Sequence, residues 1–220
     1  MGFDTIEINL VLSKVVPFRA KRTEIWRYIT YSFIHRDFEH IIANLVLQTL
    51  VGLPLEMVHG AFRISCIYMF GILGGSLASS CFDPLYNLWG ASGGVYSLIA
   101  AHLSTLILNW NEDSAIIINR ARVTKTAHAV DGKLFRVLQL LAVLTFALLD
   151  TGYAFYRRYS GEHTSVSYVA HLVGAIVGLM VGLIVLKDRI EEAWEKKMKA
   201  ICWVCFFTSF VVLILWNICA

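Results

Sequence analysis

Charged residues and proline are both scarce in this chain. Only 16% of the 220 residues are charged, and only three are proline. Soluble globular domains carry about 25% charged residues, so the composition argues against an ordinary soluble domain. Because prolines are so few, the apolar runs are seldom interrupted. The formal net charge of +3 is small and does not suggest a nucleic-acid partner.

Signals for a metal or redox centre are also weak. The sequence contains no His-Glu-x-x-His motif, which argues against a zinc protease. The five cysteines lie in or at the ends of apolar runs, and the single Cys-x-x-Cys pair, Cys202 and Cys205, has no second pair. We therefore expect no metal site and no cofactor.

Long apolar runs dominate instead, since 57% of the residues are hydrophobic. A helix that crosses a bilayer needs about 20 mostly apolar residues. Six segments meet this requirement: 41–58, 61–82, 92–110, 134–154, 166–186 and 200–218. No segment alternates like a strand, so the sequence predicts an all-α membrane protein, a polytopic bundle with about six transmembrane helices.

Basic residues orient these spans. They are frequent in and around the connections at 59–60, 111–133 and 187–199, whereas the connections at 83–91 and 155–165 hold only Arg157 and Arg158. The positive-inside rule therefore places the first set in the cytoplasm. We expect a multi-pass protein of the plasma membrane or of a secretory-pathway membrane.

Polar side chains gather at one depth of this layout. Ser92 begins the third span, His171 lies near the start of the fifth, and His40 and Asn44 open the first. All three spans enter from the external side, and at 1.5 Å rise per residue the four residues lie within roughly 8 Å of one another in depth. Polar residues inside a bilayer need partners and are functional candidates.

A stripe of glycines follows His171 at helical spacing: Gly174, Gly178 and Gly182. A neighbouring helix can approach such a stripe closely. If that neighbour is the helix that starts at Ser92, we expect Tyr96 and Ala100 to face the stripe. Ser92 and His171 would then meet at the top of the pair.

Ser92 and His171 together suggest nucleophilic catalysis. A serine hydroxyl attacks a carbonyl only when a base takes its proton, and a neutral histidine can do so. No buried carboxylate is well placed as a third member, so we expect a dyad in which Tyr96 supports the His171 ring. A serine that serves only helix packing is the alternative.

The same chemistry needs hydrogen-bond donors for the oxyanion of the tetrahedral intermediate. The Asn44 amide, a His40 ring N–H and the backbone N–H groups beside Ser92 are the candidates. We expect Gly90 and Gly93 to leave room for a substrate backbone.

Four motifs follow one another along the chain: Trp26-Arg27, His-x-x-x-Asn from His40, Gly-x-Ser-Gly from Gly90, and Ala-His-x-x-Gly-x-x-x-Gly from Ala170. In this order they resemble the motifs of the rhomboid intramembrane serine proteases of the eukaryotic secretase type. The resemblance extends over approximately residues 17–218. It implies a rhomboid-like fold and an enzyme that cuts membrane proteins.

The resemblance also implies a role for individual residues. Ser92 would be the nucleophile and His171 the base, with Tyr96 stacked on the His171 ring. His40, Asn44 and the backbone at Ser92 and Gly93 would form the oxyanion hole. Supporting positions would be Gly90, Gly174, Gly178, Trp26 and Arg27, the last two in a structural loop of the outer leaflet.

By the same resemblance, the six spans match the family's second to seventh helices. We therefore expect the family's first transmembrane helix to be missing from this chain. The expected organisation is a tail and outer-leaflet loop at 1–40, a catalytic transmembrane core at 41–186, and a cytoplasmic linker with an additional C-terminal transmembrane helix at 187–220.

The expected function is cleavage of single-pass membrane proteins near the extracytoplasmic face of the bilayer. Single-pass proteins and the lipid bilayer are the expected partners. One alternative is a catalytically impaired rhomboid relative that binds clients without cutting them. Another is a transporter with the polar cluster as its solute site, although we find no internal repeat and the cluster lies near one face.

Overall fold

The structure is a computed structural model in which the described residues are all helix, turn or extended connection, without a strand. The described ranges are 22–35, 38–84, 88–109, 167–187 and 192–219, with residues 137, 138, 140–142, 144, 145, 147–149, 151, 152, 156 and 160 between them. The predicted all-α class is confirmed.

In the part of the chain that the structure describes, five long helices follow a short N-terminal segment. This segment contains α1 (Arg27–Thr30) and the 3-10 helix η2 (Tyr31–Phe33). The long helices are α2 (Phe38–His59), α3 (Ala61–Phe82), α4 (Ser92–Leu108), α7 (Tyr168–Val185) and α8 (Ala193–Cys219). Among the described residues, α2, α3, α7 and α8 are long and apolar enough to cross a membrane, and α4 and Leu140–Leu149 are shorter apolar helices. A polytopic helical membrane protein is therefore confirmed.

The span boundaries differ from the predicted ones at several ends. The second predicted span coincides with α3, whereas α2 begins at Phe38 and α8 at Ala193, ahead of the predicted starts at 41 and 200. Residues 193–199, expected to be part of a linker, are thus helical, because Ala, Glu, Lys and Met favour a helix even where the apolar run has ended. The predicted span at 134–154 lies only partly within the described residues.

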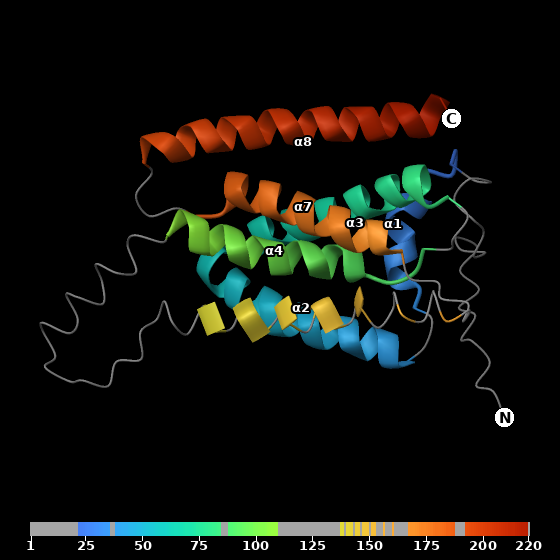
Figure 1. The fold of residues 1–220 in the computed structure, drawn as a ribbon, viewed down its shortest axis with the longest axis horizontal. Helices are drawn as coiled ribbons and strands as arrows, with labels where there is room; N and C mark the ends of the chain where they lie inside the picture. The colour runs from blue at the N-terminus through green and yellow to red at the C-terminus, as the bar shows by residue number, and fades with distance from the viewer. Residues whose placement is uncertain are drawn as a thin grey trace, which may run out of the picture.

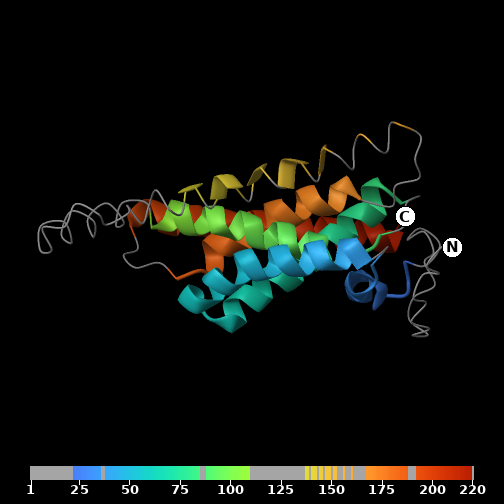
Figure 2. The ribbon, with the colours of Figure 1, turned by 90° about the horizontal axis from the view of Figure 1, so that it is seen from below.

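Helix α4 lies at the centre of the bundle and packs against α2, α3 and α7. Helix α8 lies along the outer side of α3 and α7 (Figures 1 and 2). Helices α2, α4 and α7 begin at the same end of the bundle, and α3 runs in the opposite direction (Figure 1). Gly60, with φ of +90°, provides the reversal between α2 and α3, because this region of backbone conformation is open mainly to glycine.

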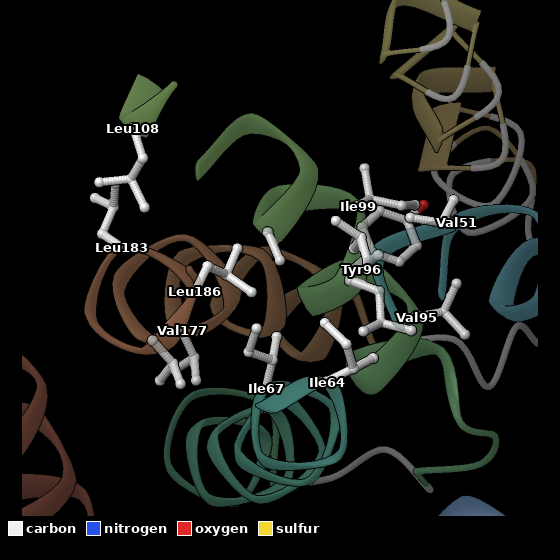
Figure 3. Close-up of a cluster of buried hydrophobic side chains, with 14 of the residues drawn as sticks. Val51, Ile64, Ile67, Val95, Tyr96, Ile99, Leu108, Val177, Leu183 and Leu186 are labelled. Carbon is white, nitrogen blue, oxygen red and sulfur yellow. The ribbon is translucent and has the colours of Figure 1, made fainter. Parts of the chain in front are cut away.

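The core lies between these central helices. Figure 3 shows part of one cluster of buried side chains that includes Val51 of α2, Ile64 and Ile67 of α3, Val95 of α4 and Val177 of α7. By contrast, α2 and α8 expose many large apolar side chains. These side chains form the kind of surface that contacts lipid in a bilayer. The central helices thus provide the buried setting for polar groups, and the outer helices provide the contact with lipid.

One buried polar contact fastens α8 to the rest of the bundle. The Asn217 side-chain oxygen accepts a hydrogen bond of 3.0 Å from the Tyr28 hydroxyl. Its Nδ2 donates to the carbonyl oxygens of Leu213, at 2.8 Å, and of Leu77, at 3.2 Å. Helix α8 is thereby connected to α1 and α3 at the end of the bundle where α4 and α7 begin.

Candidate active site

Ser92 and His171 lie side by side at the beginning of two neighbouring helices. Ser92 is the first residue of α4 and His171 is the fourth of α7. The Oγ atom of Ser92 and the Nε2 atom of His171 are 2.8 Å apart, within hydrogen-bond distance. His171 is only 4% exposed. A neutral ring with Nε2 unprotonated can accept the serine proton in this arrangement.

Tyr96 holds the His171 ring from the other side. The two ring centroids are 4.2 Å apart and the planes differ by 13°, so the rings are stacked. Tyr96 lies one turn after Ser92 on the same helix, so α4 presents both the hydroxyl and the stacking ring to His171. Among the described residues, no side chain bonds Nδ1 of His171. Within that part of the chain the arrangement is a pair rather than a triad.

The glycine stripe of α7 packs on α4, but not against the expected residues. A Cβ added at any of the three glycines would collide with α4 at Gly93, Ser97, Ala101 or Ser104. The expectation that Tyr96 and Ala100 face the stripe is therefore wrong. Small residues at 93, 97 and 101 repeat every fourth position and form the thin side of α4, which a backbone can approach. This spacing is the sequence signal that could have identified the contact.

Gly90 and Gly93 make room for neighbouring protein groups, and that they leave room for a substrate backbone stays a prediction. Gly90 has φ of +89°, and a Cβ there would lie 2.9 Å from Nε2 of His40. A Cβ at Gly93 would lie 3.3 Å from the Tyr31 hydroxyl and the Gly71 carbonyl oxygen. Both positions are crowded because α4 begins where α2, α3 and the η2 segment converge. The glycines therefore allow His40 and α3 to approach Ser92 closely.

Asn44 is buried beside this turn, one helical turn after His40. Its side chain is 6% exposed, and Nδ2 donates a hydrogen bond of 2.9 Å to the His40 carbonyl oxygen. The same Nδ2 lies 3.6 Å from the position that a Gly90 Cβ would occupy. An amide nitrogen carries two hydrogens, and this bond uses one of them. The structure thus places His40 and Asn44 next to the loop that leads into Ser92.

The backbone at Ser92 adds further donors. Ser92 and Gly93 are the first two residues of α4, and the first N–H groups of a helix have no acceptor within it. The carbonyl oxygen of Ala91 already accepts from the N–H groups of Gly94 and Val95, at 2.9 and 3.1 Å. The start of a helix also carries partial positive charge, which favours a developing oxyanion.

Trp26 and Arg27 lie in the short N-terminal segment that packs on α3. Arg27 pairs with Glu24 at 2.6 Å, and Trp26 is 45% exposed. Tyr31 of this segment is buried beside Gly93, and its hydroxyl donates a bond of 3.0 Å to the Ile72 carbonyl oxygen. Burial raises the pKa of Tyr31, so this hydroxyl keeps its proton and its role as donor. The structure brings together Ser92, His171 and Tyr96, and places Trp26 and Arg27 in a segment packed on α3.

The chain also matches a known protein family. The family model described as the Rhomboid domain matches residues 22–188. The chain belongs to the rhomboid family.

Curated relatives of this rhomboid carry similar names. Rhomboid-related protein 1 of Caenorhabditis elegans is 36% identical over 198 residues, which are 88% of this chain and 50% of the relative. Rhomboid-related protein 2 of Mus musculus is 36% identical over 180 residues, 81% of this chain and 54% of the relative. Inactive rhomboid-related protein 2 of Caenorhabditis elegans is 33% identical over 177 residues, 80% of this chain and 45% of the relative. The chain spans about half the length of these proteins.

The rhomboid chain also contains buried polar groups to which sequence reasoning gave no role. His59, at the end of α2, is 1% exposed; its Nδ1 accepts from the Lys187 backbone N–H at 3.0 Å, and its Nε2 lies 3.3 Å from the Thr105 hydroxyl. Tyr96 has a second set of contacts through its hydroxyl, to Ala147 and Thr151. The hydrogen-bond partners of His59 and Tyr96 come from segments far away in the chain, so no local sequence pattern predicts these contacts.

Proposed function

We propose that this rhomboid is an intramembrane serine protease that cleaves single-pass membrane proteins, with Ser92 as nucleophile and His171 as base. The observation that carries the proposal is the 2.8 Å contact between Ser92 Oγ and His171 Nε2 at the start of two closely packed helices. A histidine stacked on Tyr96 has little freedom to turn away from the serine. Placement of this kind is what general-base activation of a hydroxyl needs.

In the proposed reaction, His171 takes the Ser92 proton as the serine oxygen bonds to the substrate carbonyl carbon. The His171 imidazolium then gives this proton to the leaving amine, and the peptide C–N bond breaks. Water, deprotonated by His171, hydrolyses the acyl-enzyme ester and regenerates the serine. Donors for the oxyanion are proposed to be Asn44, His40 and the N–H groups of Ser92 and Gly93.

The remaining proposed features follow from the layout of the spans. The dyad lies where α4 and α7 begin, the end that the positive-inside rule assigns to the extracytoplasmic face. We propose residues 41–186 as the catalytic core, with Gly90, Gly174 and Gly178 setting its close contacts and Trp26 and Arg27 supporting it from the outer leaflet. The plasma membrane or a secretory-pathway membrane is the proposed location.

A catalytically impaired rhomboid remains the second candidate, because one relative that covers 80% of this chain is named inactive. Such a protein would bind membrane clients without hydrolysing them. Against an impaired protein, this chain has both Ser92 and His171, and their side chains lie within hydrogen-bond distance of each other. Nothing in the comparisons favours a transporter.

A serine-directed fluorophosphonate separates the two candidates. The detergent-purified chain is expected to be labelled at Ser92 and at no other serine, because among the described serines Ser92 has its hydroxyl within hydrogen-bond distance of a histidine ring. Mass spectrometry of the labelled peptide identifies the site, and prior heat denaturation should abolish the reaction. Label on a different serine, or no label on a folded chain, would contradict the protease assignment.

Asn44→Ala is expected to lower kcat by about 10²- to 10³-fold while KM changes little. An oxyanion donor acts mainly when charge develops on the carbonyl oxygen, so its loss raises the barrier rather than weakening binding. Steady-state cleavage of a single-pass reporter in liposomes measures both constants. Asn109→Ala, which removes a buried amide at the far end of α4, is the matched control. A rise in KM alone would instead assign Asn44 to substrate docking.

A further inference from the structure

Tyr96 joins the His171 ring to a neighbouring helix from a distant part of the chain. That helix, here called the fourth-span helix, comprises the described residues between 137 and 152. The Tyr96 hydroxyl donates to the Ala147 carbonyl oxygen at 3.0 Å and lies 2.8 Å from the Thr151 hydroxyl. Figure 3 shows Tyr96 among Val51, Val95 and Ile99, on the side of α4 that faces this helix.

The direction of these two bonds can be worked out from the number of hydrogens. A tyrosine hydroxyl has one hydrogen, and it is used in the bond to the Ala147 carbonyl oxygen, which can only accept. Either hydroxyl can be the donor in the 2.8 Å contact, and while Tyr96 donates to Ala147 the Thr151 hydroxyl donates to the Tyr96 oxygen. Thr151 and Ala147 are one helical turn apart, so together they hold the hydroxyl from two directions.

The ring of Tyr96 transmits this restraint to the dyad. One face of the ring is stacked on His171 with an interplanar angle of 13°, so the plane of Tyr96 limits the plane of His171. The plane of the imidazole in turn decides where Nε2 points, and Nε2 must point at Ser92 Oγ. If the Tyr96 hydroxyl lost these two hydrogen bonds, the stacked rings of Tyr96 and His171 could tilt together.

We propose that Thr151 is a positioning residue for the base, acting on His171 through Tyr96. This inference rests on the proposed protease function and adds to it a residue outside the dyad and the oxyanion donors. Thr151 does not touch the reacting atoms. The Thr151 hydroxyl fixes the orientation of the Tyr96 ring, and the Tyr96 ring fixes the direction in which Nε2 of His171 points.

Three substitutions isolate the hydroxyl. Thr151→Val keeps the branched shape and removes the donor, Thr151→Ser keeps the donor and removes a methyl group, and Tyr96→Phe removes the acceptor. A misplacement of about 1 Å can cost 10²-fold in rate, and loss of one restraint should cost less, about tenfold in kcat with KM nearly unchanged. Thr151→Ser keeps the hydroxyl, so its kcat should stay within about threefold of the wild-type value, a smaller loss than that of Thr151→Val. Thr151→Val should add nothing to Tyr96→Phe.

Thr145→Val is the matched control. Thr145 is exposed on the same helix, and its hydroxyl donates within the helix to the Leu141 carbonyl oxygen at 2.8 Å. The experiment measures kcat and KM for reporter cleavage, the rate of fluorophosphonate labelling at Ser92, and thermal unfolding of each variant in the full chain. We expect slower cleavage and labelling in Thr151→Val but not in Thr145→Val, with both variants folded.

The outcomes distinguish the two proposals. In one outcome, the wild-type protein is labelled at Ser92 and cleaves the reporter while Thr151→Val and Thr145→Val have the same kcat. That result would overturn the positioning role of Thr151 and leave the protease function intact. A loss of activity in Thr151→Val that only matches its unfolded fraction, or that Thr151→Ser fails to rescue, would overturn it as well. Folded wild-type protein that neither labels nor cleaves would overturn both proposals.

Discussion

Ser92→Ala and His171→Asn are each expected to reduce cleavage of a single-pass reporter to the background of a membrane without enzyme, a loss of about 10⁴-fold or more. The two side chains share one proton in the proposed reaction, across the 2.8 Å contact between Oγ and Nε2. Removing either partner stops the transfer. The double variant should therefore be no slower than the single ones, because the residues act as a unit.

Stability distinguishes lost chemistry from lost structure in the Ser92→Ala variant. This variant loses one hydrogen bond, so its free energy of unfolding should fall by no more than about 1.5 kcal/mol. Ser209→Ala, an exposed serine of α8, is the control and should cleave at the wild-type rate. Cleavage retained by a folded Ser92→Ala variant would place the nucleophile elsewhere or exclude this mechanism.

Gly178→Val is expected to damage the fold and thereby the site. The first carbon of any side chain at this position would overlap the backbone of Ser97, and a backbone cannot move aside as a flexible side chain can. Overpacking of this kind costs about 1–3 kcal/mol, occasionally more, and it would separate α7 from α4. Because Ser92 and His171 lie on these two helices, reporter cleavage and thermal stability should fall together.

Leu172→Val provides the comparison on the same helix. Leu172 is exposed on α7, so a valine there meets no neighbouring backbone and should leave stability and cleavage near wild type. Gly178→Ala should lie between wild type and Gly178→Val, since its single methyl group meets the same Ser97 atoms. Wild-type stability in Gly178→Val would show that α4 and α7 do not pack as closely as the structure has them.

The helical class and most of the spans could be derived from the sequence, because they depend on local properties. The apolar run at 61–82 coincides with α3, since both of its ends are marked by a change in composition. Helix α8 begins at Ala193, ahead of the apolar run that starts at 200, because helix propensity extends beyond the apolar residues that mark a span. The glycine positions also revealed where a close helix contact would lie, because only small residues permit one.

Depth within the bundle could likewise be read from the chain, since rise per residue is constant in a helix. This places Ser92 and His171 at one level, and the structure has their side chains within hydrogen-bond distance. Which faces of two helices meet is a different matter, because it depends on the rotation of each helix about its axis. The α4 residues opposite the glycine stripe were therefore misassigned by one position along the chain.

The helical membrane class and the level at which the polar residues lie follow from the amino-acid order alone, because hydropathy and helical rise are properties of one segment at a time. Three contacts are visible only in the folded chain: Gly90 accommodates His40, Asn217 connects α8 to Tyr28, and Thr151 bonds Tyr96. Each of these contacts joins segments whose relative position is set by the packing of the whole bundle. A hydrogen bond or a steric fit of this kind depends on distances of a few tenths of an ångström, which no local pattern specifies.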